Sequence, residues 1–211
     1  MANPLSPLQN NRKTGRSGCS GTAGVTLEEI SDFTLLQYAA WGATLPQVGG
    51  LAAAAASCEK APQPGQGMLG DTVSLLRVEP LKWWLIAAPG TTVPPTDLAP
   101  QEGVILDMQD GRRWLRISGD RAETLLNHFL PLNLRSSAFP VGAVASTAFH
   151  HVGVTLWRDP DHFNLLIPRS SAQSLWELLS ESARQYGLVE NQRPLASHLA
   201  RRTNNETAYV P

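Results

Sequence analysis

The clearest hydrophobic pattern in the chain predicts two helices. Apolar positions recur every three or four residues over 122–130 and again over 172–186. This spacing is typical of helices that bury one face against a core. Leu125 and Leu175 lie in the middle of the two apolar stripes, so we expect both side chains to be buried.

Between these helices the hydrophobic period changes to two. Apolar residues alternate with others over 152–157 and over 163–167, and the Arg-Asp-Pro-Asp segment 158–161 separates the two runs. Alternation of this kind is typical of strands, and the acid–Pro segment is typical of a turn. The pattern therefore predicts a β-hairpin between the two helices.

Both helices carry sequence signals at their ends. Asp120 with Glu123, and Ser170 with Gln173, have the three-residue spacing of capping boxes. Gly187 follows the second apolar stripe, where a glycine commonly ends a helix. We therefore expect side-chain caps at both helix starts and a glycine stop after the second helix.

The first half of the chain has a weaker version of the same pattern. Apolar residues of mixed spacing predict strands over 25–41. Pro46 can begin a helix, and the alanine-rich segment 48–59 predicts its body, although its pair of glycines weakens the signal. Two further strands are predicted over 72–78 and 83–88, with a turn between them.

A second hairpin is predicted near the middle of the chain, over 104–108 and 113–117. Asp110-Gly111 lies between these runs, and Asp-Gly is a strong turn dipeptide. The segment 91–100 before it contains three prolines, which predicts a linker.

A faint internal repeat relates the two halves. Residues 79–86 resemble residues 159–166, because in both an acid–Pro turn leads into a strand that opens with an aromatic residue. We therefore expect an α+β fold in which one domain, 25–190, consists of two similar strand–helix–hairpin halves, 25–100 and 101–190. Chance recurrence of a common turn is the alternative.

Polar composition predicts flexible segments at both ends, an N-terminal arm over 1–24 and a C-terminal tail over 191–211. The chain has 211 residues, 42% of them hydrophobic, and a formal net charge of −1. A sizeable core is therefore expected, and a global basic field for nucleic acid is not. Cationic residues gather near the two ends: Arg12, Lys13, Arg16, Arg201 and Arg202. We expect them to be solvated, with a phosphate or partner contact as the alternative.

Nothing in the chain predicts export or membrane insertion. The first residues lack the apolar core of a secretion signal. The apolar run 51–56 is far shorter than the ~20 residues that span a bilayer. Cys19 and Cys58 form no metal-type pair and are expected to be reduced thiols. A cytoplasmic protein without a membrane partner is expected.

Two candidate motifs for chemistry fail because of their context. His150 and His151 are neighbours, and neighbouring residues of a strand point to opposite faces, so they cannot grip one metal ion. Gly65, Gly67 and Gly70 have the spacing of a dinucleotide-binding loop. Prolines precede them and a strand follows, whereas that loop needs a strand before it and a helix after it.

The turn Ser118-Gly119-Asp120 is the nearest approach to a hydrolase nucleophile. It joins a predicted strand to a predicted helix, but no Gly-x-Ser-x-Gly motif surrounds it, and capping explains Asp120. We therefore expect no catalytic, cofactor-binding or metal-binding residue in this chain.

The same stretch of sequence carries a family resemblance. From about residue 75 to residue 188, the pattern of apolar, Gly, Pro and aromatic residues resembles the gamma subunit of heterotetrameric sarcosine oxidase. The segments that carry it are 117–134, 139–142, 166–170, 174–176 and 186–187. The matched pattern is structural and carries no catalytic signature.

The resemblance implies a fold similar to the folate-binding domains of aminomethyltransferases, and a role as a non-catalytic accessory subunit. It also implies partners: larger alpha and beta subunits and a small zinc-binding delta subunit. In such a complex the other subunits hold FAD, FMN, NAD and tetrahydrofolate. They oxidise sarcosine or a related N-methyl amino acid and pass the one-carbon unit to tetrahydrofolate.

Two other functions stay open. One is a free-standing, folate-binding, aminomethyltransferase-like protein. The other is a folate-dependent iron–sulfur assembly and RNA-modification factor of related fold. That last family carries a Lys-Gly-Cys-Tyr-type motif, and neither Cys19 nor Cys58 has this context.

Trp83 and Trp84 are the candidate residues for a subunit interface. As neighbours on a strand, they place their indoles on opposite faces of the sheet. One can join the core under a helix, whereas the other must lie under the second half of the chain or lie open beside Leu81 and Ile86. We predict that one of them is buried against another subunit. Internal burial between the halves is the close alternative.

Overall fold

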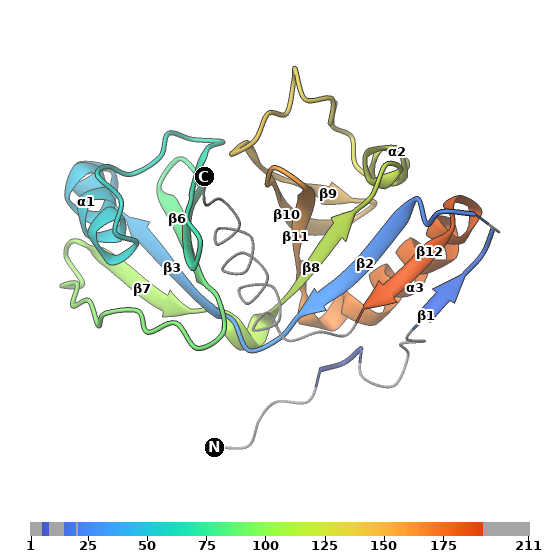
Figure 1. The fold of residues 1–211 in the computed structure, drawn as a ribbon. Coiled ribbons are helices and arrows are strands. Elements are labelled where there is room, and N and C mark those ends of the chain that lie inside the picture. The colour runs from blue at the N-terminus through green and yellow to red at the C-terminus, as the bar shows by residue number, and fades with distance from the viewer. Residues whose placement is uncertain (1–5, 9–14, 20, 192–211) are drawn as a thin grey trace, which may run out of the picture.

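Two β-sheets pack face to face, and α-helices cover their outer faces (Figure 1). The computed structural model describes residues 6–8, 15–19 and 21–191. Most of the strands and helices are those that the alternating and helical patterns predict, whereas three short strands and the strand Val144–Phe149 were not predicted.

The larger sheet has seven strands among the described residues. Neighbouring strands are antiparallel except for one parallel pair, between the strands that begin at Val25 and at Leu188. In spatial order the strands are β1 (Gly15–Ser17), β12 (Leu188–Asn191), β2 (Val25–Ile30), β8 (Arg112–Ser118), β11 (His162–Pro168), β10 (Val152–Arg158) and β9 (Val144–Phe149).

In the described part of the chain the smaller sheet has five strands, and all its neighbouring pairs are antiparallel. In spatial order they are β4 (Gly67–Leu69), β5 (Val73–Glu79), β6 (Lys82–Ala87), β3 (Thr34–Ala40) and β7 (Gly103–Asp107). The two sheets touch at one edge, where Gln66 forms an isolated antiparallel bridge with Ala143 and Ser146 Oγ donates to the Val78 carbonyl at 2.9 Å.

Three α-helices and four short 3₁₀ turns complete the described chain. The α-helices are α1 (Leu45–Ala55), α2 (Ala122–Asn127) and α3 (Ala172–Ala183). The 3₁₀ turns are η1 (Gly42–Thr44), η2 (Gln109–Gly111), η3 (Arg169–Ser171) and η4 (Arg184–Tyr186). No helix among the described residues is long and apolar enough to cross a membrane.

Three apolar clusters fill the spaces between these layers. The first packs α2 and α3 on the outer face of the larger sheet, and it contains Leu125 and Leu175. The second lies between the two sheets, with Trp84 from one and Trp157 from the other. The third packs α1 on the outer face of the smaller sheet. The order of layers is therefore helix, sheet, sheet, helix.

The predicted duplication is present in the topology. In each half a strand leads to a helix, and a three-stranded meander then returns to pair with that first strand. The halves are β3–α1–β4–β5–β6 and β8–α2–β9–β10–β11, with spatial orders 4-5-6-3 and 9-10-11-8. The fold class is therefore the predicted α+β type with two similar halves.

The halves also exchange one strand each, which the boundaries drawn at residue 100 do not describe. β2 directly precedes β3 in the chain but pairs with β8 of the larger sheet. β7 directly precedes β8 but pairs with β3 of the smaller sheet. The exchange ties the two halves together with backbone hydrogen bonds.

This exchange makes the predicted hairpin across Asp110-Gly111 wrong. Both strands exist, as β7 and β8, but they belong to different sheets. The Asp-Gly pair lies in η2, a 3₁₀ turn that carries the chain from one sheet to the other. A local turn signal does not specify which strands pair, because a strand can bury its apolar face by pairing with a strand that is distant in sequence.

The predicted side-chain caps are also wrong, whereas the predicted glycine stop is confirmed. At α2, Arg121 occupies the N-cap position without a side-chain hydrogen bond, and its backbone N–H donates to the Gly24 carbonyl at 2.9 Å. At α3, η3 precedes the helix, and Ala172 N–H donates to the Arg169 carbonyl within that turn. At both helix starts, backbone carbonyls therefore accept hydrogen bonds from backbone N–H groups, where side-chain acceptors were expected. Gly187 follows η4 with φ +74°, a conformation that glycine adopts without strain.

The expected N-terminal arm contributes one short strand. Gly15–Ser17 forms β1, which pairs with β12 at the edge of the larger sheet. Leu8 is buried in the cluster under α2 and α3. Residues 1–5, 9–14 and 20 of that predicted arm, and 192–211 of the predicted tail, lie outside the described residues.

Candidate functional site

Trp83 and Trp84, the predicted interface residues, lie on β6 and point to opposite faces of the smaller sheet, as neighbours on a strand must. Trp83 belongs to the cluster under α1, where Gly49 of that helix leaves room for its ring. Trp84 belongs to the cluster between the sheets, and its Nε1 donates to Gln37 Oε1 at 3.0 Å. The Arg112 guanidinium lies 5.2 Å from the Trp84 ring centroid.

The prediction that one of these indoles lies open for a partner is therefore wrong for this chain. Trp83 is 1% exposed and Trp84 is 5% exposed. The close alternative, burial inside the chain, describes both. The error arose because the second sheet and α1 cover the two faces of β6, and their packing cannot be seen in the local sequence.

A different tryptophan is exposed. Trp41 follows β3 and is 51% exposed, and Leu81, in the turn between β5 and β6, is 40% exposed. The two lie at the same end of the smaller sheet, because Ala40 N–H donates to the Leu81 carbonyl at 2.9 Å. Trp41 Nε1 donates to the Pro100 carbonyl at 3.0 Å, which holds the indole in place although the residue is half exposed. Sequence reasoning missed this residue because it counted Trp41 among strand positions.

A chain of polar contacts lies next to the space between the sheets. Trp114 Nε1 donates to Asn164 Oδ1 at 2.8 Å, and Asn164 Nδ2 donates to Asp159 Oδ2 at 3.0 Å. His162 Nε2 lies 2.7 Å from the same carboxylate oxygen. Strands β8 and β11 supply the first two residues, and the turn after β10 supplies the carboxylate.

The Asp159 carboxyl has a lowered pKa. Burial acts in the opposite direction and raises the pKa, because it disfavours the charged form. The close contact with His162, the hydrogen bond from Asn164 and the positive charge of Arg116 outweigh that burial. The carboxylate is therefore kept ionised and oriented, and it can hold a neighbouring cation or hydrogen-bond donor.

Buried ion pairs flank this polar group. Arg116 Nη1 lies 3.6 Å from Glu28 Oε2, and Arg113 Nε lies 3.9 Å from Glu29 Oε1. Burial lowers the pKa of Arg116, whereas the Glu28 and Asp159 carboxylates raise it. These pairs join β2 to β8, so they reinforce the exchanged strand.

Two small pockets open beside Asp159. One, of about 190 Å³, is lined by the 158–163 turn and by the 119–123 turn at the start of α2. The other, of about 80 Å³, lies between the sheets and is lined by Trp114 and Trp157 on one side and by Ile86 on the other. The arrangement can bind or orient a small polar group, but the pockets are well below the ~300–1,000 Å³ that drug-sized ligands occupy.

The structure does not assemble a hydrolytic site from the Ser118 turn. Asp120 lines the larger pocket together with Asp159 and His162. Ser118 lies opposite His162 in the β8–β11 register, but the imidazole contacts Asp159. The contact between Asp159 and His162 has a sequence signal, an Asp and a His three residues apart, but the sequence was interpreted there only as a turn.

The remaining candidate motifs have ordinary structural places. His150 and His151 form the tight turn between β9 and β10 and are not on a strand as assumed, with His150 at φ +53°. Gly67 begins β4, so the glycine spacing at 65–70 does not precede a helix. Within the described residues, no group of His, Cys, Asp and Glu could hold a metal ion.

Asp159→Asn is expected to lower the free energy of unfolding by about 1–3 kcal/mol at neutral pH, the usual cost of leaving buried polar partners unsatisfied. Because the folded-state pKa of Asp159 is lowered, its stabilisation is present above the unfolded-state pKa near 3.9 and is lost as pH falls through the lower folded value. Denaturant titrations at pH 7 and near pH 3 should show a difference that shrinks in acid. Asp161→Asn, an exposed residue of the same turn, is the matched control and should change little. An equal loss at both pH values would contradict the ionised role of Asp159.

The chain was compared with known proteins in sequence and in fold. No protein-family model matches the chain. Sarcosine oxidase subunit gamma of Corynebacterium sp. (strain P-1) is 29% identical over 157 residues, which cover 71% of this chain and 75% of that protein.

Two solved structures share the fold. A chain of heterotetrameric sarcosine oxidase from Corynebacterium sp. U-96 superposes with a TM-score of 0.67 at 21% identity, covering 81% of this chain and 88% of that one. Glycine cleavage system aminomethyltransferase T from Bartonella henselae superposes with a TM-score of 0.56 at 18% identity, covering 83% of this chain and 49% of that one. The chain is thus similar to the gamma subunit of sarcosine oxidase, as its sequence pattern predicts, and it has the α+β fold that the aminomethyltransferase shares.

Proposed function

We propose that this protein is an accessory subunit of a sarcosine-oxidase-like heterotetrameric oxidoreductase. The observation that carries the proposal is the similarity to sarcosine oxidase subunit gamma, which extends over 71% of the chain. The match in fold to a chain of a heterotetrameric sarcosine oxidase supports it.

In this proposal the chemistry belongs to other subunits. Larger alpha and beta subunits, with a small zinc-binding delta subunit, hold FAD, FMN, NAD and tetrahydrofolate. They oxidise sarcosine or a related N-methyl amino acid in the cytoplasm and transfer the one-carbon unit to tetrahydrofolate. This chain binds none of these cofactors alone and contributes no catalytic residue.

The pockets beside Asp159 are smaller than a folate would need. Tetrahydrofolate joins a pteridine, an aminobenzoate and a glutamate, and ligands of that size need pockets of about 300–1,000 Å³. The two pockets beside Asp159 measure about 190 and 80 Å³.

Trp41 with Leu81 is the docking face that we propose in place of Trp83 and Trp84. Tryptophan is a frequent interface anchor, and an anchor that is already fixed in the free chain loses little entropy on binding. The hydrogen bond from Trp41 Nε1 to the Pro100 carbonyl supplies that fixation.

Trp41→Ala is expected to weaken assembly with the partner subunits by at least about 2 kcal/mol, the usual hot-spot threshold. The melting temperature of the free chain should change little, because the side chain is half exposed. Val141→Ala, which changes another exposed apolar side chain in the turn before β9, is the matched control. Affinity measured by biolayer interferometry with the purified partners tests the proposal. Equal affinities for the wild type and Trp41→Ala would exclude this face.

The overall function is tested by purifying the tagged chain from its native cell and identifying co-purifying proteins by mass spectrometry. The expected result is a stoichiometric complex with flavoprotein subunits that oxidises an N-methyl amino acid, while the isolated chain is colourless and inactive. A yellow isolated chain with amine oxidase activity would overturn the proposal. Micromolar binding of tetrahydrofolate to the chain alone would favour the aminomethyltransferase-like alternative.

A further inference from the structure

The smaller sheet ends on a strand that pairs on one side only. β7 is last in the strand order and pairs with β3, and among the described residues no strand lies on its other side. An edge of this kind presents backbone N–H and C=O groups to whatever lies beside it. β7 is therefore a candidate surface for pairing with another chain.

Hydrogen bonds at both ends of β7 fix the direction in which its backbone groups point. Met108 N–H, directly after the strand, donates to the Leu35 carbonyl of β3 at 2.9 Å. Gly103 N–H, at the start of the strand, donates instead to the Ala99 carbonyl of the preceding turn at 3.2 Å. Residues of an antiparallel strand point alternately toward a neighbouring strand and away from it. Both bonds therefore indicate that the even-numbered residues face β3 and the odd-numbered residues face outward.

The outward residues Ile105 and Asp107 keep backbone groups without a protein partner. No hydrogen bond joins the N–H of either residue to another part of the described chain. The segment before β7 packs Val93 and Leu98 against the cluster under α1, and its one backbone bond to β7 in the described structure is that of Gly103. A strand added at this edge can therefore pair with both outward residues.

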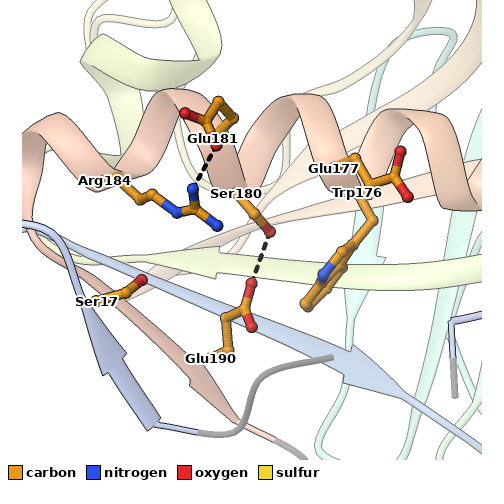
Figure 2. A pocket seen from close by; sticks show the side chains of 7 residues that line it. All are labelled: Ser17, Trp176, Glu177, Ser180, Glu181, Arg184 and Glu190. Atoms are coloured by element: carbon orange, nitrogen blue, oxygen red, sulfur yellow. Dashed lines mark hydrogen bonds and ion pairs between the residues drawn. The ribbon is translucent and has the colours of Figure 1, made fainter. Parts of the chain in front are cut away.

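β12, near an edge of the larger sheet, is held differently, by contacts within the chain. It pairs with β1, and Ser180 Oγ of α3 donates to Glu190 Oε1 of β12 at 2.7 Å (Figure 2). The Trp176 indole lies beside this pair in the wall of a pocket of about 140 Å³. Helix and strand are thus tied together there, whereas the outward N–H groups of β7 have no such contact in the residues that the structure describes.

Acidic side chains lie along one side of the β7 edge, the side that α1 covers. Ile105 packs against the cluster under α1, and Asp107 points to the same face because it lies two residues farther along the strand. Glu102 Oε1 accepts a hydrogen bond from Gln47 Nε2 of α1. Asp97 lies in the segment before β7, which packs on that same side. Three carboxylates therefore gather on one face of the edge.

These three carboxylates have no cationic partner in the described part of the chain. Asp97, Glu102 and Asp107 take part in none of its ion pairs. The sequence between Lys82 and Arg112 contains no lysine, arginine or histidine. This face of the edge therefore favours a positively charged strand. A second copy of β7 is disfavoured, because it would bring the same three acids to the same face of the joined sheet.

The other face of the edge is apolar. Leu106 lies opposite Gln37 in the β3–β7 register, and Gln37 accepts a hydrogen bond from Trp84 in the cluster between the sheets. Leu106 therefore points to the inner side of the sheet, yet it is 41% exposed, so the core does not cover it. An added strand would meet carboxylates on one face and a leucine on the other.

We propose that β7 binds an extended segment of a partner chain in which basic and apolar residues alternate, as an added strand of the smaller sheet. The backbone of that segment pairs with Ile105 and Asp107, its basic side chains lie beside the three acids, and an apolar side chain packs on Leu106. Alternation is required because successive side chains of a strand leave opposite faces. The inference does not depend on the subunit role proposed above, and its test uses this chain alone.

Nuclear magnetic resonance of the full chain tests the proposal with a capped hexapeptide of alternating lysine and valine. Binding is expected to saturate with a dissociation constant below about 1 mM. Amide hydrogen exchange of Ile105 and Asp107 should slow at least about tenfold in the complex, whereas Leu106, which already faces β3, should not change. Three control peptides should bind at least about tenfold more weakly, because each lacks one feature of the proposed strand. They are a glutamate–valine alternation, a peptide with its lysines and valines in two blocks, and a lysine–valine alternation that is N-methylated at every residue.

Variants locate the binding at this edge. Asp107→Pro removes an outward N–H and a charge without breaking a bond to β3, and it should weaken the lysine–valine peptide at least about tenfold. Asp107→Asn keeps the acceptor that Gln109 N–H uses and removes the charge alone, so binding should weaken about threefold even if the proline variant unfolds. Asp161→Asn, an exposed acid beside the larger sheet, is the control and should leave the affinity unchanged.

Several results would overturn the proposal. Unchanged exchange of Ile105 and Asp107 at saturating peptide would mean that the edge does not pair. Equal binding of the glutamate–valine peptide would mean that the acids do not select a basic strand. Slow exchange of both residues in the free chain would mean that the edge is already occupied, by a second copy if the protection rises with protein concentration and by another segment of this chain if it does not.

Discussion

Trp83→Ala and Trp84→Ala are each expected to lower the free energy of unfolding of the free chain by about 3–5 kcal/mol, as truncations of fully buried tryptophans do. Each indole fills a different apolar cluster, one under α1 and one between the sheets. Their removal leaves cavities that the surrounding strands and helix cannot close, because the backbone of β6 pairs on both sides. Denaturant unfolding followed by circular dichroism measures the loss.

The two phenylalanine variants should separate packing from hydrogen bonding. Trp83 Nε1 has no partner in the described residues, so Trp83→Phe loses ring volume alone. Trp84→Phe also breaks the bond to Gln37 Oε1 and leaves that half-buried acceptor unsatisfied. We expect Trp84→Phe to cost more than Trp83→Phe by about 1 kcal/mol, the typical net worth of such a bond.

Trp41→Ala in the free chain is the matched control, since it removes the same side chain from a half-exposed position. Its expected cost is below about 1 kcal/mol, as for surface substitutions in general. If Trp83→Ala or Trp84→Ala left unfolding unchanged and weakened partner binding instead, that indole would be an interface residue after all. The burial of both rings inside the chain makes the opposite result the expected one.

Sequence patterns identified most elements of this fold because those elements are locally determined. The alternating runs became β10 and β11, and the apolar stripe from Ala172 to Ala183 became the buried face of α3. The glycine pair in α1 weakened its prediction, yet Gly49 is where Trp83 lies against the helix. The glycine is therefore explained by packing that only the folded chain reveals.

Pairing between distant strands could not be predicted in the same way. β7 and β8 have the composition and spacing of a hairpin, and Asp110-Gly111 has turn chemistry. The two strands separate because β7 pairs with β3 at the edge of the smaller sheet, whereas β8 lies between β2 and β11 in the larger sheet. β1, β4 and β12 have only three or four residues, too few for a period of two to stand out from loop sequence.

The candidate sites were the least predictable part. Asp159 and His162 were visible as a turn, but the lowered pKa of Asp159 depends in part on Arg116, which lies 43 residues earlier on β8, the strand that pairs with β11. Trp176 was correctly placed in the buried stripe of α3. That its nitrogen faces a pocket wall formed by β12 depends on a strand that the sequence did not indicate.

Leu125→Ala and Leu175→Ala are expected to lower the free energy of unfolding by about 2–5 kcal/mol each, the range for buried leucine truncations. Leu125 is fully buried, and Leu175 is nearly so; both belong to the cluster between the helices and the larger sheet. Leu125 should lie toward the upper end of the range, because α2 has only six residues and depends on its buried side chains for its position.

Leu81→Ala is the matched control for this pair, since it removes the same atoms from an exposed turn. Its expected effect on the free chain is within about 0.5 kcal/mol, as for surface substitutions. The three variants are compared by urea unfolding under one condition. The shift of each midpoint is converted to a change in the free energy of unfolding with a common m-value. A loss below about half a kcal/mol for Leu125→Ala would mean that α2 does not pack on the sheet in solution. Because α2 and α3 share one apolar cluster, we expect the two substitutions to be coupled. The free-energy loss of the double variant should differ measurably from the sum of the two single losses. Two independent helices would give additive losses.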